Sequence, residues 1–355
     1  MNRVEKVLRR VDAAQQRFPP AALIFGVMKK FGDDNAGNLT ASLAFSAFIC
    51  VFPLLLLFVT VLNIVLADHS GAKNDLIHSV LSQFPIVGNQ LRSISGLHRS
   101  SVVGLIVGVL GLLWGTTGLA QSGLFSMAQI WNLSGPERPN YIKRLGRSLA
   151  FLSVLGTGVV ITTALAGFGT FGRHNVALGI VSEVVAVVAN VATYFGVFRV
   201  LTPKVVHSRQ LIAGAVFGGV VWTILQAVGG YLIGHDLHND SAYGIFAVVL
   251  GLVAWIYLGS EVTLYGAELN TVLARHLWPR GMVQPPLTEA DQRSMALQAT
   301  QNQRRPEQTV SVGFTTPAMS QQDWLSSREV TPAEGPNGSE ADPHSHPTDS
   351  EQIAE

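Results

Sequence analysis

Residues 39–66 read LTASLAFSAFICVFPLLLLFVTVLNIVL and contain no Asp, Glu, Lys or Arg. An α-helix needs about 20 mostly apolar residues to cross the hydrocarbon core of a bilayer. The apolar residues here are continuous rather than alternating with polar ones, which disfavours a strand of a membrane barrel. The pattern recurs along the chain and predicts six transmembrane helices, at about 39–66, 102–122, 149–171, 176–200, 210–234 and 244–270.

The composition excludes an ordinary soluble protein. Of the 355 residues, 13% are charged and 48% are hydrophobic, and the mean hydropathy is +0.33. This charged fraction is about half of the usual one. Residues 283–355 carry four Lys and Arg against eleven Asp and Glu, whereas residues 1–282 carry 20 against 12. We therefore expect an all-α polytopic membrane protein with a basic, apolar body and an acidic tail.

The distribution of Lys and Arg between the predicted helices indicates their orientation. The N-terminal segment and the regions after the second, fourth and sixth helices together hold 16 of these residues. The opposite side holds four, namely Lys73, Arg92, Arg99 and Arg173. Because Lys and Arg are in excess in short cytoplasmic segments, we expect both termini to lie in the cytoplasm.

Three regions follow from these patterns. Residues 1–38 form a basic amphipathic segment, residues 39–275 the six-helix membrane domain, and residues 276–355 a cytoplasmic tail. From about residue 283 the tail is rich in Pro, Ser, Thr, Gln and acids without an apolar period, so we predict that it is disordered. Residues 76–84 form a second amphipathic segment, predicted on the outer side.

The N-terminal segment contains an apolar stripe among basic residues, formed by Val4, Val7, Leu8 and Val11. Such a helix suits an anionic membrane leaflet. Docking of the helix on the protein itself is an equal alternative.

Small residues predict where the helices pack closely. Glycines at a spacing of 4, 3, 4 and 3 lie on one face of the second helix, namely Gly104, Gly108, Gly111, Gly115 and Gly118. Such a face allows another backbone to approach, within one bundle or between two copies of the chain. Gly214 and Gly218, which are spaced by four, form a similar small-residue face in the fifth helix. Pro53 lacks an amide hydrogen and is expected to kink the first helix.

Ionisable and amide side chains inside the predicted helices are the candidate site residues. Glu183 and Asn190 are seven residues apart in the fourth helix, as are Glu261 and Glu268 in the sixth, with Asn270 nearby. A carboxylate in hydrocarbon is costly unless it is paired, wetted or protonated. We therefore expect these faces to point inward. They form either a polar pathway or structural hydrogen bonds between helices. For Glu268, which is close to the cytoplasmic end and to Arg275, an anchoring or ion-pair role is the stronger expectation.

The sequence predicts no metal site and no cofactor. The single cysteine, Cys50, excludes a cysteine metal cluster, and the residues from His235 to Asp240 lack a closed ligand set. No phosphate-binding loop of the Gly-x-x-x-x-Gly-Lys type occurs, so we do not expect ATP hydrolysis.

Short motifs follow one another in a fixed order along the chain. They are Leu39 to Phe48 with Val51-Phe52-Pro53-Leu54, Trp131-Asn132, the basic segment Arg138–Arg147, Thr202-Pro203-Lys204, Ala213-Gly214-Ala215, Trp222, Tyr243-Gly244, Trp255-Ile256-Tyr257-Leu258 and Gly266-Ala267-Glu268-Leu269-Asn270. This ordered set resembles the YihY/BrkB family over roughly residues 30–275. Phe45-Ser46 departs from the family pattern, which often has an aromatic pair there.

The resemblance implies a six-span protein of the bacterial cytoplasmic membrane, without catalytic residues that could be transferred. Some members carry the label ribonuclease BN, and some are linked to the export of envelope lipids. No metal-dependent nuclease motif is present here, so we expect neither an enzyme nor a nucleic acid partner. We expect membrane lipids as partners and translocation of an envelope lipid or other amphiphile as the function. The alternative is a membrane scaffold that binds envelope proteins or a second copy of the chain.

Overall fold

The computed structural model describes residues 3–65, 101–134, 141–171, 176–203, 205–236 and 244–314. Within these ranges every regular element is helical and no strand occurs, which confirms the predicted all-α class. The elements are α1 (Arg3–Arg17), α2 (Pro19–Asp33), α3 (Ala36–Val65), α6 (Ser101–Ile130), α7 (Tyr141–Phe171), α8 (Val176–Leu201), the short 3₁₀ helix η2 (Ser208–Leu211), α9 (Ile212–Asp236), α10 (Gly244–Arg275) and α11 (Glu289–Gln301). The predicted amphipathic segment 76–84 lies outside the described residues.

The described helices include five that are long and apolar enough to cross a membrane. Their spans are Ala36–Leu54, Leu145–Thr162, Ile180–Leu201, Ser208–Gly229 and Val249–Arg275. Large apolar side chains on their outer faces, such as Ile180 and Leu250, are exposed, as expected where lipid is the solvent. The remaining predicted span lies in α6, a helix of 30 residues. That α6 crosses the membrane and that both termini are cytoplasmic stay predictions.

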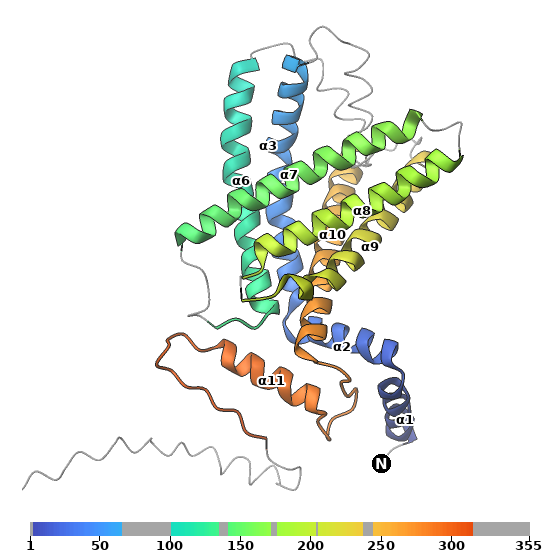
Figure 1. The fold of residues 1–355 in the computed structure, drawn as a ribbon, viewed down its shortest axis with the longest axis vertical. Helices are drawn as coiled ribbons and strands as arrows, with labels where there is room; N and C mark the ends of the chain where they lie inside the picture. The colour runs from blue at the N-terminus through green and yellow to red at the C-terminus, as the bar shows by residue number, and fades with distance from the viewer. Residues whose placement is uncertain are drawn as a thin grey trace, which may run out of the picture. The chain divides into compact units, whose positions relative to one another are not determined.

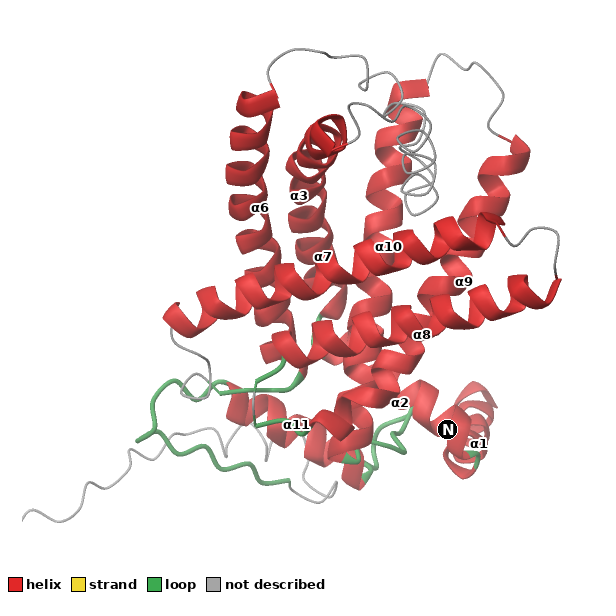
Figure 2. Cartoon of the chain, turned by 45° about the horizontal axis from the view of Figure 1, so that its top comes forward, coloured by secondary structure: helices red, strands yellow, loops and turns green. Residues whose placement is uncertain are grey.

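The long helices form two groups, which α10 joins and which also meet where α6 contacts α7. α3 and α6 pack side by side, and α8 packs against both α7 and α9 (Figure 1). α10 contacts α3 as well as α9, and Figure 2 shows it between them. The buried core draws on most of these helices, with Met127 of α6, Phe198 of α8 and Leu264 of α10 fully buried. The interior between the helices is therefore lined by residues far apart in sequence.

The contact between α3 and α6 uses part of the predicted glycine face. A methyl group added to Gly111 would lie 3.1 Å from Cβ of Pro53, and one added to Gly115 would lie 3.2 Å from Cα of Cys50. Gly118 has no such neighbour within 4 Å among the described residues, so the expectation for this residue is corrected. On a straight helix, residues spaced by seven drift around the helix axis by about 20° per repeat, so the glycine face gradually turns away from α3. At the end of the contact near Gly118, α3 and α6 meet instead through Ser42 and Ser122, whose hydroxyls lie 3.2 Å apart.

The other residues of the glycine and proline predictions are less completely described. Gly108 is buried, whereas the surroundings of Gly104 lie outside the described residues. α3 continues across Pro53 to Val65, and the kink stays a prediction.

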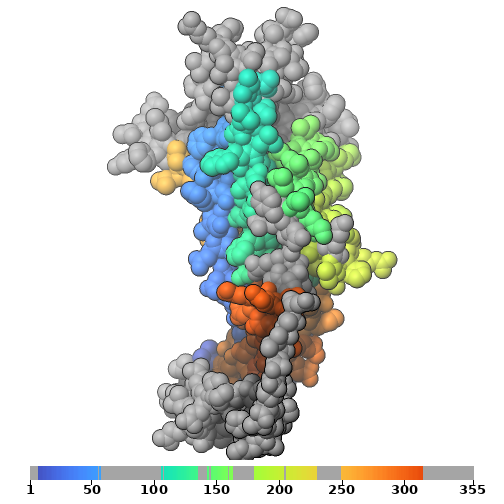
Figure 3. All heavy atoms as spheres, turned by 90° about the vertical axis from the view of Figure 1, so that its left-hand side faces the viewer, coloured from blue at the N-terminus to red at the C-terminus, as the bar shows by residue number. Residues whose placement is uncertain are grey.

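The predicted disorder of the tail is wrong for its first part. Residues 276–314 are described, and they include helix α11. The segment lies below the end of α6 in Figure 3, where Gln301 donates to the side-chain oxygen of Gln129 at 2.6 Å. The prediction failed because this segment is held by polar contacts together with a few apolar residues, such as Leu277 and Leu297, which belong to or pack against a cluster with Val27 and Val272. Residues 315–355 lie outside the described part of the chain.

The N-terminal helix α1 forms as predicted, and its polar side docks on the chain. The carboxylate of Asp12 accepts the backbone N–H of Met282 at 3.0 Å and that of Val283 at 3.5 Å. Val7, Leu8 and Val11 remain exposed. The alternative that α1 docks on the protein itself is thus confirmed for its polar side. Contact of its exposed apolar residues with a membrane stays a prediction.

Candidate functional site: the cavity between the helices

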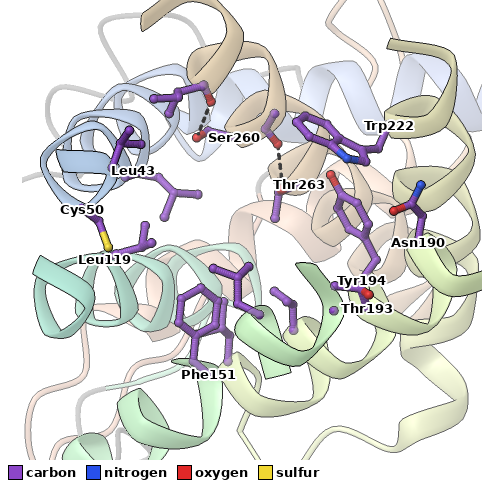
Figure 4. A pocket seen from close by; sticks show the side chains of 18 of the residues that line it. Leu43, Cys50, Leu119, Phe151, Asn190, Thr193, Tyr194, Trp222, Ser260 and Thr263 are labelled. Atoms are coloured by element: carbon purple, nitrogen blue, oxygen red, sulfur yellow. Dashed lines mark hydrogen bonds between the residues drawn. The ribbon is translucent and has the colours of Figure 1, made fainter. Parts of the chain in front are cut away.

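A cavity of about 290 Å³ lies between the two groups of helices. Figure 4 shows its walls, to which α3, α6, α7, α8, α9 and α10 all contribute. Its apolar side includes Leu43 and Cys50 of α3, Leu119 of α6 and Phe151 of α7. Among the described residues that line it, none is Asp, Glu, Lys, Arg or His. The volume is close to the lower end of the range of about 300–1,000 Å³ for ligand pockets.

The serine and threonine hydroxyls in the described wall are occupied as hydrogen-bond donors. Each donates to the carbonyl four residues earlier on its own helix, two of these bonds being drawn in Figure 4. The bonds run from Thr162 to Gly158 at 2.9 Å, from Thr193 to Ala189 at 2.8 Å, from Ser260 to Ile256 at 2.9 Å and from Thr263 to Gly259 at 2.7 Å. A hydroxyl has one donor and two acceptor lone pairs, so these groups offer a ligand only acceptors.

Asn190 is the only member of the predicted polar pathway among the described lining residues. Its amide Nδ2 donates to Thr223 Oγ1 at 3.0 Å and to Gln226 Oε1 at 3.3 Å, both on α9. Figure 4 shows Asn190 at the edge of the site, beside Tyr194. Its amide protons therefore join α8 to α9, which is the structural role that the sequence left open.

The aromatic wall depends on closely packed glycines. The rings of Trp222 and Trp255 lie 5.8 Å apart between centroids. Behind the wall, a methyl group on Gly218 would lie 2.6 Å from the ring of Tyr194. Tyr194 can pack there because glycine leaves room for its ring, so the second predicted glycine pair helps to shape the cavity.

The predicted carboxylates do not converge on this cavity. Glu183 is exposed on α8, so the expectation that it points inward is corrected. Glu261 is half-buried on α10 and is absent from the described lining. Residues spaced by seven lie on the same face of a helix, but neighbouring helices need not cover that face along its whole length. On α8 this face is buried at Asn190 and exposed at Glu183. The structure thus separates the residues that the sequence grouped into one pathway.

Glu268 and Asn270 lie instead near the end of α10, where the chain turns into the segment 276–301. Both are fully buried. Asn270 Oδ1 accepts the backbone N–H of Gly214 at 2.7 Å, which pins α9 to α10. Glu268 Oε2 lies 3.6 Å from Nζ of Lys30 on α2, so the basic group nearest to this carboxyl is Lys30 rather than the expected Arg275.

We call Lys30, Asp34 and Glu268 the basal cluster. Lys30 Nζ also forms an ion pair with Asp34 and donates to the carbonyl of Ile130 at 3.0 Å. An ammonium suits the C-terminal end of a helix such as α6. Sequence reasoning counted Lys30 only as a basic charge, although its spacing of four from Asp34 on a helix was a usable signal.

A second set of charges fixes the segment after α10. The carboxylate of Asp291 accepts hydrogen bonds from Arg280 Nε at 2.8 Å, Lys29 Nζ at 3.0 Å, the backbone N–H of Gly281 at 3.1 Å and Thr288 Oγ1 at 2.8 Å. Burial by itself raises the pKa of Asp291, but these donors together hold that pKa well below its ordinary value of 3.8.

This pKa predicts how the attachment of α11 depends on pH. A carboxylate with a depressed pKa stabilises the folded state at all pH values above its ordinary pKa, and that stability is lost as the pH falls toward the depressed value. We expect the protection factor of residues 289–301, which is hydrogen exchange corrected for the intrinsic effect of pH on amide exchange, to be unchanged from neutral pH down to about pH 4 and to fall below it. In the variant Asp291→Asn the exchange should be fast already at neutral pH; equal protection in both proteins would contradict the assignment.

Comparison with known sequences shows the family of this chain. The family described as Virulence factor BrkB matches residues 27–286. The chain belongs to this family. The BrkB match includes Lys30, Asp34 and Glu268 and ends before α11.

Curated relatives of this BrkB family member are described as UPF0761 membrane proteins. The protein of Pseudoalteromonas atlantica is 26% identical over 65% of this chain and 79% of its own length. The protein of Xanthomonas euvesicatoria pv. vesicatoria is 25% identical over 81% and 69%, respectively. The protein of a Psychrobacter species is 23% identical over 68% of this chain, which spans only 46% of that relative. No solved structure matches. With the five apolar helices, these relatives identify a multi-pass bacterial membrane protein.

Proposed function

We propose that this protein binds the hydrocarbon part of a membrane amphiphile in the cavity and moves it across the bilayer without chemical conversion. The observation that carries the proposal is the cavity itself, which is bordered by helices from both groups and lined mainly by apolar side chains. Apolar surface transferred from water gains roughly 25 cal/mol per Å², but a ligand already in lipid gains little from this effect. Shape and packing must therefore select it.

The lack of charge in the described lining restricts what the cavity can hold. An ionised headgroup inside it would have no partner of opposite charge, and burying an unpaired charge is costly. The wall hydroxyls can accept hydrogen bonds from a neutral polar group. We therefore expect a hydrocarbon chain or another uncharged part of the amphiphile to occupy the cavity. Glu183 and Glu261 have no role in this proposal.

The test is transbilayer movement of a fluorescent phospholipid in liposomes that contain the purified protein. Ala47→Phe fills the cavity from α3, so we expect the protein-dependent rate to fall by about tenfold, equivalent to ~1.4 kcal/mol. Ala41→Phe is the matched control, because Ala41 is exposed on the same helix. Glu261→Gln should retain the wild-type rate, since this residue does not line the cavity.

Two results would count against the proposal. One is the absence of movement above protein-free liposomes for lipids of the native membrane, which would favour the scaffold alternative. The other is an equal loss in Ala41→Phe and Ala47→Phe, which would assign the effect to helix packing in general. Gel filtration and the melting temperature of each variant show whether it is folded before its rate is compared.

A further inference from the structure

The basal cluster contains one more acidic group than basic group. Lys30 carries the single positive charge, while Asp34 and Glu268 supply two carboxyls. The side chains of Lys30 and Glu268 have no exposed surface and that of Asp34 is 2% exposed. If all three groups were ionised, a net negative charge would be buried without solvent.

The two carboxyls differ in their contacts. Asp34 pairs closely with Lys30 and also accepts the side-chain N–H of Gln298 at 3.3 Å. Neither oxygen of Glu268 has a hydrogen-bond partner at ordinary bonding distance among the described residues. Lys30 Nζ, at 3.6 Å from Oε2, is within ion-pair range but beyond normal hydrogen-bond length. Asp34 therefore holds the ammonium, and Glu268 is left as a buried carboxyl with little to stabilise a charge.

Among the described residues, the surroundings supply no second cation for Glu268. Arg280 and Lys29 are engaged by Asp33 and Asp291, which form a separate set with two charges of each sign. From α6, the backbone carbonyl of Ile130 accepts a hydrogen bond from Lys30, and from α11 the neutral side chain of Gln298 donates one to Asp34. On α10 itself, the titratable group that interacts with Glu268 is Tyr265. The excess charge is thus not neutralised by any described neighbour.

We propose that the basal cluster is a proton-binding site, in which Glu268 carries a proton while α2, α6 and α10 are packed together. An unpaired buried carboxylate costs several kcal/mol, and such a group normally takes up a proton instead. When these helices separate and water reaches Glu268, the carboxyl ionises and the proton is released to the solvent. The packed arrangement therefore binds one proton more than the separated one. This inference goes beyond amphiphile translocation and stands independently of it.

The test measures the proton directly, by infrared spectroscopy of the full chain in liposomes at neutral pH. A protonated carboxyl has a C=O stretching band that an ionised one lacks. We expect the spectrum of the wild type minus that of Glu268→Gln to show one such carboxyl per chain. Asp34→Asn should lose the same band although Glu268 is intact, because Lys30 and Glu268 then form a neutral ion pair. Lys30→Met should gain a second carboxyl band, because the cation that ionises Asp34 is removed.

Matched measurements keep this outcome interpretable. Glu261→Gln, two turns earlier on α10 and outside the basal cluster, should retain the band of the cluster. The melting temperature of the wild type should fall as the pH rises from about 5 through neutrality, because above the ordinary Glu pKa of about 4.3 the separated state is ionised while the packed state still holds its proton; in Glu268→Gln this fall should be absent. If Glu268→Gln is folded and leaves the carboxyl bands unchanged, or if Asp34→Asn keeps the band, the proposal is wrong. None of these readouts requires lipid movement, so they are unaffected by failure of the proposed function.

Discussion

Replacement of Gly214 by alanine is expected to prevent normal packing of α9 on α10. A methyl group at this position would lie 2.5 Å from Nδ2 of Asn270 and closer still to the carbonyl oxygen of Gly266. Backbone at such a crossing cannot move aside as a flexible side chain can. The helices would have to separate, which also weakens the hydrogen bond from Gly214 N–H to Asn270. We expect a loss of about 3 kcal/mol or more in stability.

The measurement is the melting temperature in detergent, together with the yield of monodisperse protein. Gly118→Ala is the control, because a methyl group there meets nothing within 4 Å in the described part of the chain. Alanine is favoured over glycine inside a helix by roughly 1 kcal/mol, so this variant should be as stable as the wild type or slightly more so. Equal behaviour of the two variants would show that the contact between Gly214 and Gly266 is not as close as described.

Replacement of Asp291 by alanine is expected to release the segment 276–301. Arg280 and Lys29 would each lose an acceptor, although Asp33 still pairs with Arg280 at 2.6 Å and the carbonyl of Gly281 still accepts from Lys29 at 2.7 Å. Removing one partner of a buried ion pair costs about 3–5 kcal/mol, and the retained contacts place the expected cost near the lower value. Hydrogen exchange in α11 should report this loss locally.

The control for Asp291→Ala lies on the same helix. Glu289 pairs with Arg293 at 3.2 Å, but both side chains are exposed, so Glu289→Ala should change stability by no more than about 0.5 kcal/mol. Protection of α11 in Asp291→Ala as strong as in the Glu289→Ala control would mean that other contacts hold the segment.

The failure to predict α11 has an instructive cause. Its N-terminus carries a recognisable signal, because Thr288 and Asp291 form reciprocal capping hydrogen bonds. The residues that α11 buries are small or polar, namely Ala290, Asp291 and Ser294. A composition argument that requires an apolar helix face therefore predicts disorder. The helix is held instead by charged residues of α2 and of the turn after α10, and by Leu297, which packs against the apolar cluster of Val27, Val272 and Leu277. Attention to the capping pattern could have found the helix, but not its position.

The candidate site shows a similar division. The sequence identified Asn190 and Gly218, which do line or shape the cavity, because a polar amide and small residues inside apolar spans are locally unusual. It also grouped Asn190 with Glu183, which is exposed. Spacing along one helix determines a shared face but not which part of that face a neighbour covers.

The sequence by itself determined that the chain is a helical membrane protein, because the cost of placing each residue type in hydrocarbon is a local property. The order of its motifs likewise determined the family. Only the tertiary structure decided that Lys30 meets Glu268, that Asp291 receives Lys29 and Arg280, and that the cavity lacks the predicted carboxylates. These pairings join residues far apart in the chain. Their energies depend on distance and burial in the packed state, which no pattern of neighbouring residues encodes.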